Sequence, residues 1–189
     1  KEKIVGSALV DIGVETSSLA VFENGSLISL NTFSIGGGDI TNDIALGLKI
    51  PLEKAENLKL RNIEDDSSKK KLDEIIDARL SDIFELIENN LKKIKRNELL
   101  PAGIIFIGGS SNIKGLEEFS KSTLKLPSKI GTSELFGNSK TKLRDGSYFT
   151  ALGLLATSDN SEPYSEGSLS IFWKDLKRSI KSSIKQLMP

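Results

Sequence analysis

Residues 6–34 read GSALVDIGVETSSLAVFENGSLISLNTFS, and this stretch decides the fold. Three runs within it have the apolar content and alternation typical of strands: residues 6–12, 18–23 and 26–34. Asn24-Gly25 separates the last two runs, and both residues accept the positive φ angles of a tight hairpin turn. The stretch therefore predicts three consecutive antiparallel strands, with Asp11 near the end of the first.

A helical block is predicted next, because the run Gly36-Gly37-Gly38 ends the strand pattern. Asp39 is expected to be the N-cap of the first helix, since its carboxylate can accept a hydrogen bond from a free amide. Residues 61–71 are polar and predict a solvated loop. The expected helices cover residues 39–48, 51–60 and 72–95, of which the last has apolar residues at intervals of three and four.

The remaining pattern alternates strands and helices. Residues 104–107 form a short apolar run between glycines, which favours a strand buried on both faces. We expect a helix over residues 116–124, a strand over 127–131 and a final helix over 149–156. The sequence thus predicts a mixed α/β domain formed by residues 1–38 and 98–156, with residues 39–97 inserted as a helical subdomain.

Composition excludes several classes of site. The 189 residues include 26 Lys and Arg and 26 Asp and Glu, so the formal net charge is zero, and we expect no nucleic-acid partner. The chain has no Cys and no His, which removes thiolate or imidazole zinc sites and imidazole-dependent catalytic triads. Oxygen ligands remain, and these suit Mg²⁺ or Ca²⁺.

Two glycine turns carry the candidate chemistry. Asp11 ends a strand and is followed by Gly13, a combination that suits a water-held Mg²⁺ beside a phosphate group. Gly108-Gly109-Ser110 follows the strand at residues 104–107 and leaves main chain open to a ligand. The alternative for the first turn is a polar hairpin turn with an incidental Asp, and the alternative for the second is a tight strand-to-helix turn without a ligand. We expect both turns to lie at strand ends of one sheet.

The C-terminal segment differs in composition from the rest. Residues 157–168 are polar and predict a disordered linker. From Ser168 to Pro189 the chain has five basic residues and one acidic residue, a formal charge of +4. Residues 169–189 are therefore expected to form an amphipathic helix that binds an anionic membrane surface. Packing on the domain and docking in a partner's groove are the alternatives. The expected membrane-binding residues are Phe172, Trp173, Leu176, Lys177, Arg178, Ile180, Lys181, Ile184, Lys185 and Leu187.

These motifs, taken in order, resemble the C-terminal half of the bacterial cell-division protein family FtsA, within the actin/Hsp70 superfamily. The resemblance covers about residues 4–156. The matching stretches are Val10-Asp11-Ile12-Gly13, residues 19–27, residues 40–48, Glu74-Ile75-Ile76-Asp77-Ala78-Arg79-Leu80, residues 100–109 and Gly115-Leu116. The basic amphipathic segment after a linker is the feature that this family uses to hold the membrane.

The resemblance implies a fold and a set of ligands. It implies an actin-like ATPase domain with an RNase H-like mixed sheet, and ATP with Mg²⁺ in a cleft shared with a preceding domain. Asp11 and Gly13 would match the second phosphate loop, with Asp11 near the metal, and Gly108, Gly109 and Ser110 the adenosine loop. Glu56 and Lys59 would match positions near adenine or ribose.

The implied function is a cytoskeletal adaptor. It would polymerise into actin-like filaments at the division site, on the cytoplasmic face of the inner membrane, and bind the C-terminal tail of FtsZ through the helical subdomain. Where the family usually has Asp-x-Gly-Gly-Gly-Thr, Val14 and Glu15 replace two glycines, so we expect at most a weak ATPase. The alternatives are a PilM-like pilus-assembly protein that binds a peptide of a membrane partner, and a sugar-kinase-like phosphotransferase.

Overall fold

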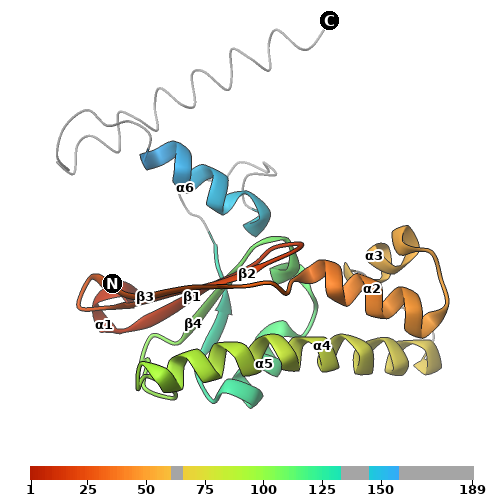
Figure 1. Ribbon diagram of the computed structural model, residues 1–189, viewed down its shortest axis with the longest axis horizontal. Coiled ribbons are helices and arrows are strands. Elements are labelled where there is room, and N and C mark those ends of the chain that lie inside the picture. Colours follow the sequence, from red (N-terminus) through yellow and green to blue (C-terminus); the bar gives the residue numbers. More distant parts are fainter. Residues whose placement is uncertain (61–65, 133–144, 158–189) are drawn as a thin grey trace, which may run out of the picture. The chain divides into compact units, whose positions relative to one another are not determined.

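The computed structural model describes residues 1–60, 66–132 and 145–157. The chain divides into two compact units, Lys1–Phe149 and Thr150–Pro189. The first unit contains the whole sheet and the helices that pack on it (Figure 1). The predicted linker and amphipathic helix, residues 158–189, lie outside the described residues, as does residue range 133–144.

A five-stranded mixed sheet with the order β3-β2-β1-β4-β5 forms the centre of the first unit. Its strands are β1 (Ser7–Ile12), β2 (Ser17–Glu23), β3 (Ser26–Phe33), β4 (Ile104–Ile107) and β5 (Ser128–Ile130). The first three strands pair antiparallel, and β4 pairs parallel with both β1 and β5. Asn24 and Gly25 have φ angles of 52° and 80°, which confirms the expected hairpin turn.

The helices are α1 (Glu2–Val5), α2 (Gly37–Leu48), α3 (Leu52–Leu60), α4 (Asp66–Lys93), α5 (Leu116–Leu124) and α6 (Phe149–Thr157). Short 3₁₀ turns cover Gly109–Asn112 and Gly146–Tyr148. Helix α1 had no predicted counterpart. The prediction of a loop up to residue 71 was wrong from Asp66 onward, because α4 begins at Asp66 and its first turns carry the exposed residues Lys69, Lys70 and Lys71.

The predicted N-cap of α2 was also wrong. Gly36 occupies the N-cap, and Asp39 lies at the third helical position. The Asp39 carboxylate accepts a hydrogen bond of 2.8 Å from the Gly36 amide, so it satisfies a donor that precedes the helix. The carboxylate therefore stabilises the same helix end as predicted, from a position inside the helix.

The core lies between one face of the sheet and helices α4 and α5, and it continues between α2, α3 and α4. Figure 1 shows the long α4 extending along the sheet and onward beside α2. Phe84 of α4 is fully buried, and its ring centroid lies 5.9 Å from that of Phe106 in β4 and 5.7 Å from that of Phe119 in α5. A buried Phe contributes roughly 1.5–3 kcal/mol, so this aromatic group fixes α4 and α5 against the sheet.

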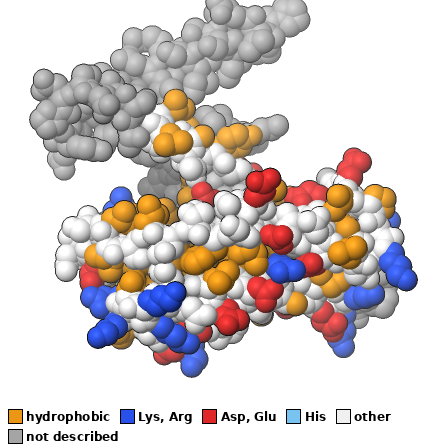
Figure 2. Space-filling view, in the orientation of Figure 1, with side chains coloured by type: hydrophobic (Ala, Val, Ile, Leu, Met, Phe, Trp, Pro, Cys, Tyr) orange, Lys and Arg blue, Asp and Glu red, His pale blue; other side chains and the backbone are white. Residues whose placement is uncertain are grey.

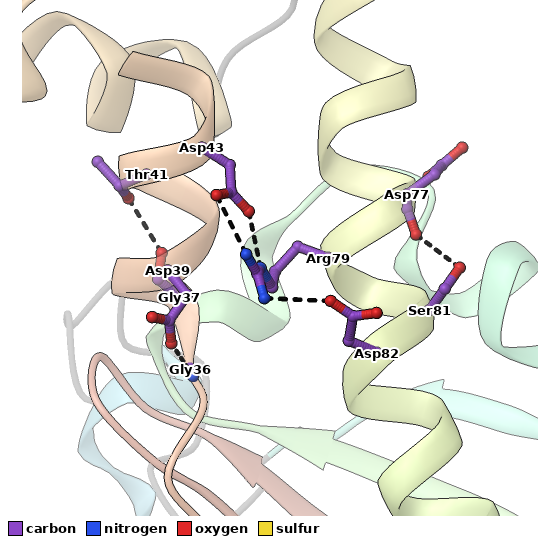
Figure 3. A network of polar contacts seen from close by, with 9 residues as sticks. All are labelled: Gly36, Gly37, Asp39, Thr41, Asp43, Asp77, Arg79, Ser81 and Asp82. Atoms are coloured by element: carbon purple, nitrogen blue, oxygen red, sulfur yellow. Dashed lines mark hydrogen bonds and ion pairs between the residues drawn. The ribbon is translucent and has the colours of Figure 1, made fainter. Parts of the chain in front are cut away.

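An ion-pair network fixes α2 to α4 (Figure 3). The Arg79 guanidinium donates to both carboxylate oxygens of Asp43, at 2.7 and 3.1 Å, and to Asp82 on its own helix at 3.1 Å. The two-pronged contact constrains the orientation of α2 as well as its distance. The pKa of Arg79 is raised, chiefly by the hydrogen bonds to Asp43.

The predicted division into a sheet subdomain and an inserted helical subdomain at residues 39–97 stays a prediction. Residues 1–149 of these two parts fall within one compact unit, and residues 150–156 fall within the other. In the part of the chain that the structure describes, no helix has the length and apolar content needed to span a bilayer. Figure 2 shows acidic, basic and apolar side chains interspersed over one face of the molecule, in keeping with the balanced net charge.

Candidate functional site

The two glycine turns emerge at one edge of the sheet. Strands β1 and β4 are parallel neighbours, with Asp11 opposite Ile107, so their carboxyl ends lie side by side. Gly13 follows the first strand, and Gly108 follows the second. The expectation that both turns lie at strand ends of one sheet is therefore confirmed. Crevices at such ends of open α/β sheets are common ligand sites.

The N-terminus of α2 is tied to the first turn. The Gly37 amide donates to the Gly13 carbonyl at 2.8 Å, and the Gly38 amide donates to the Val14 carbonyl at 2.7 Å. The Gly13 amide in turn donates to the Thr16 carbonyl at 2.9 Å, which closes the hairpin. Amides at a helix N-terminus often bind anions. Here the first two amides are already used by the turn, so they hold α2 against the sheet.

Glycine is required where the second turn meets these elements. A Cβ on Gly37 would collide with the side chain of Ser110, and a Cβ on Gly108 would collide with the Asp11 carboxylate. Gly109 differs, because among the described residues its Cβ would meet only Ser147 Oγ, at an ordinary 3.6 Å. The described residues therefore leave space in front of Gly109 through which a ligand can approach the main chain.

A buried lysine connects α3 to this assembly. Lys59 is 6% exposed, and its Nζ donates to the Gly37 carbonyl at 3.0 Å, to Thr41 Oγ1 at 2.9 Å and to Glu56 Oε2 at 2.7 Å. Thr41 Oγ1 also contacts the Gly37 carbonyl at 3.0 Å (Figure 3) and the Glu56 carboxylate. A hydroxyl has one proton, so Thr41 donates to one of these two acceptors at a time. The Lys59 ammonium group has three N–H donors, and the Gly37 carbonyl, Thr41 and Glu56 accept one hydrogen bond each.

Glu56 is the exposed end of this network, with half of its side chain accessible. Burial acts to raise the pKa of Glu56. The hydrogen bonds from Lys59 and Thr41, together with the positive charge of Lys59, lower this pKa by more than burial raises it. The pKa therefore lies below its usual value, and the carboxylate is ionised at neutral pH. An ionised, half-exposed carboxylate can accept hydrogen bonds from ligand hydroxyl groups.

A pocket of about 550 Å³ opens beside the first turn and the network. Its lining residues are Val14, Glu15, Ser34, Gly38, Asp39, Thr41, Asn42, Leu52, Glu53 and Glu56. The walls come from the β1–β2 turn, the end of β3, α2 and α3. This volume is within the range of small-molecule sites in proteins.

The structure brings together most of the residues that the sequence singled out. Asp11 and Gly108 lie within contact range of each other. Gly37 forms hydrogen bonds with Gly13 and Lys59 and packs against Ser110. Sequence reasoning did not identify Gly37 and Thr41, which link these residues, as part of the site. The run of three glycines at 36–38 could have indicated the role of Gly37. The ligand roles predicted for these positions stay predictions. The predicted membrane-binding residues, Phe172 to Leu187, lie outside the described residues.

The metal prediction rests on Asp11 alone. Among the described residues, no group of three or more Asp or Glu side chains is placed to hold a metal ion. Mg²⁺ commonly keeps several waters and needs one or two protein carboxylates with substrate phosphates. A single carboxylate at the sheet edge therefore fits a water-held Mg²⁺ that arrives with a nucleotide, and does not fit a resident metal cage.

Comparison with known proteins identifies the family. Residues 8–153 match the family model described as cell division protein FtsA. The chain belongs to the FtsA family. FtsA of Pseudomonas aeruginosa is 29% identical over 176 residues, covering 82% of this chain and 42% of the relative. FtsA of Neisseria meningitidis serogroup B is 31% identical over 177 residues, covering 82% of this chain and 43% of the relative. The chain thus spans less than half the length of these FtsA relatives.

Solved structures establish the actin-like fold of this FtsA-family chain. MreB5 of Spiroplasma citri bound to ADP aligns with a TM-score of 0.60 at 17% identity, covering 98% of this chain and 57% of that one. A chain of the PilM–PilN type IV pilus biogenesis complex aligns with a TM-score of 0.65 at 20% identity, covering 81% of this chain and 46% of that one. The predicted actin-like mixed sheet is confirmed. PilM shares this fold, whereas the matching family is FtsA.

Proposed function

We propose that this chain supplies half of a nucleotide site in an actin-like cell-division protein, with ATP and Mg²⁺ as its ligands. The observation that carries the proposal is the Lys59 network, which joins both glycine turns to the exposed Glu56 carboxylate through Gly37. The solved MreB5 relative in fold was bound to ADP. Since the chain covers less than half of its FtsA relatives, the rest of the site would come from outside this chain.

Each residue has a separate part in this proposal. Gly109 admits the adenosine end of the nucleotide to the main chain, with Gly108 and Ser110 shaping the turn around it. Glu56 accepts hydrogen bonds from hydroxyl groups of the ribose, and Lys59 positions Glu56. Asp11 holds a water-bound Mg²⁺ near the phosphates, and that ion would supply charge neutralisation. We assign no catalytic residue to this chain.

The adaptor role extends the proposal beyond the nucleotide. Membership of the FtsA cell-division family supports this extension. We propose that it assembles into actin-like filaments at the division site and that residues 169–189 bind the cytoplasmic face of the inner membrane. The +4 charge of that segment and its apolar stripe support this, since each basic residue near an anionic leaflet contributes ~1 kcal/mol. The helical block α2–α4 is proposed to bind the C-terminal tail of FtsZ.

The nucleotide proposal is tested with a glycine pair. Gly109→Ala adds a methyl group where the protein itself has room, so the unfolding midpoint should stay unchanged. Gly153→Ala is the control, because among the described residues no atom lies within 4 Å of a Cβ there and Gly153 is outside the two glycine turns. Titration of the full chain with Mg²⁺-ADP, followed by ligand-observed NMR, should show weakened binding for Gly109→Ala only. Equal binding by wild type and Gly109→Ala would contradict the assignment of this turn.

The membrane and partner roles need separate experiments. Flotation with anionic and neutral liposomes should show binding to the anionic ones only, and removal of residues 169–189 should abolish it. Absence of binding by the intact chain would place that segment among protein-binding helices. For the second role, a pull-down with an FtsZ C-terminal peptide should fail when residues 39–97 are grafted out of the protein. Retained capture would show that the peptide binds elsewhere.

A further inference from the structure

The two edges of the sheet differ in how they are protected. At one edge β5 has three residues, and the Ile130 amide donates to the Glu117 carboxylate of α5 at 2.6 Å. At the other edge β3 has eight residues. Within the described residues, the backbone of β3 forms hydrogen bonds with β2 and with no other segment. The outward amides and carbonyls of β3 are therefore an open template for another strand.

The sequence of β3 lacks the residues that commonly keep an edge strand from pairing. Residues 24–38 contain no charged residue and no proline, although 28% of the whole chain is charged. The strand has a bulge at Ile28, which has no partner in β2, and the register of residues 29–33 is regular. The second half of β3 is thus a regular, uncharged edge that a further strand can join.

The exposed side of this edge is apolar. Leu30 lies opposite Ala20 in the register, and the two neighbours of Ala20, Leu19 and Val21, are fully buried. Because successive residues of a strand point to opposite faces, Leu30 lies on the face away from the core. Leu30 is 64% exposed and Ile28 is 42% exposed. A second strand along β3 would remove part of this apolar area from water.

We propose that β3 is an interface between two copies of this chain, paired antiparallel about a two-fold axis at Leu30. About this axis Leu30 faces Leu30 of the second copy. Ser29 then faces Asn31, and Ile28 faces Thr32, so polar residues meet polar ones and aliphatic groups meet methyl groups. This self-complementary pattern favours a second copy as the occupant. The formal net charge of zero adds no net repulsion between copies.

This contact differs from the one that a filament needs. A two-fold contact uses the same surface on both copies and closes at two, whereas a filament grows by a head-to-tail contact between two different surfaces. One edge strand also buries less than the ~1,200 Å² of a small stable interface. We therefore expect a weak dimer that forms reversibly as the concentration rises. The inference does not rest on nucleotide binding.

Sedimentation velocity of the full chain, from low micromolar to submillimolar concentration, tests the dimer. Leu30→Lys places two like charges opposite each other at the axis, and it should weaken the dimer by about tenfold or more. Leu46→Lys is the matched control, because Leu46 is a 77% exposed leucine on α2, and it should leave the dimer unchanged. Circular dichroism verifies that both variants are folded.

Disulfide cross-linking tests the register. The chain has no cysteine, so Leu30→Cys introduces a single thiol. At the axis this thiol meets its copy within the ~4.4–6.8 Å Cα separation that a disulfide needs. Ser26→Cys is the control, because its two copies would lie roughly 25 Å apart along the paired strands. Mild oxidation should give a covalent dimer of Leu30→Cys and not of Ser26→Cys.

Each result decides the inference. A wild-type chain that stays monomeric at the highest concentration would overturn it. A dimer that persists in Leu30→Lys would show that the copies meet at another surface, which also overturns it. Equal cross-linking of Leu30→Cys and Ser26→Cys would show unspecific contact between chains and would exclude the two-fold register.

Discussion

Replacing Lys59 by Met tests whether the buried ammonium group fixes α3 to the sheet edge. The substitution keeps a linear side chain of similar size in the buried position, so packing is largely preserved. It removes the three hydrogen bonds from Nζ to Gly37, Thr41 and Glu56. Helices α2 and α3 then keep their apolar contacts and the contact between Thr41 and Glu56, and they lose the bonds that the ammonium group makes between them.

The expected loss of stability depends on how deeply each of the three acceptors is buried. The Glu56 carboxylate is half exposed, so water replaces Lys59 there, and this pair is worth ~0.5–1 kcal/mol. Gly37 and Thr41 are buried, and each lost hydrogen bond costs ~1 kcal/mol. Thr41 can still donate to the Gly37 carbonyl at 3.0 Å, which limits the penalty. The sum is a loss of about 2–3 kcal/mol, or roughly a 30- to 150-fold change in the unfolding equilibrium constant.

Urea unfolding of the full chain, followed by circular dichroism at a helix wavelength, measures this loss. Lys54→Met is the matched control, because Lys54 is an exposed lysine on the same helix α3. It should change the free energy of unfolding by less than about 0.5 kcal/mol. Equal effects of the two substitutions would refute the assignment of Lys59 as the connecting residue.

Three further predictions follow from other contacts. Gly37→Ala should lose about 1–3 kcal/mol of stability because its Cβ meets the Ser110 side chain, and adding Ser110→Ala should recover part of it; equal losses in the single and double variants would contradict this. Arg79→Lys should lose about 0.5–1 kcal/mol, since Lys cannot keep both bonds to Asp43, and thermal unfolding measures it. Burial and a like charge one turn earlier raise the pKa of Asp77, so its ionised form costs stability as pH rises past that pKa. Asp77→Asn should therefore stabilise the chain by a few tenths of a kcal/mol at about pH 7 and have no effect at about pH 3.

The co-location of the two glycine turns could be predicted from sequence. Asp11-Ile12-Gly13 and Ile107-Gly108 each end an apolar run, and parallel neighbouring strands place such ends at one edge. The buried state of Lys59 could not be predicted in this way. Lys54 and Lys59 lie on one short polar helix, and only tertiary contact with the Gly37 carbonyl decides which of the two is buried. The spacing gave only a weak indication that Lys59 is buried, since Lys59 lies one helical turn after Ala55, which is buried.

The glycines at this edge have two different physical origins, and only one of them indicates a ligand. Gly37 and Gly108 are glycine because Ser110 and Asp11 of the same chain occupy the space where a Cβ would lie. Their presence is explained without any ligand, so a glycine-rich turn is weak support for a nucleotide site. Gly109 has no such neighbour closer than 3.6 Å. Of these three glycines, Gly109 is therefore the one that supports the nucleotide site, beside the Lys59 network. A chain in which Gly109→Ala changes neither stability nor ligand binding would leave the three glycines with a purely architectural role.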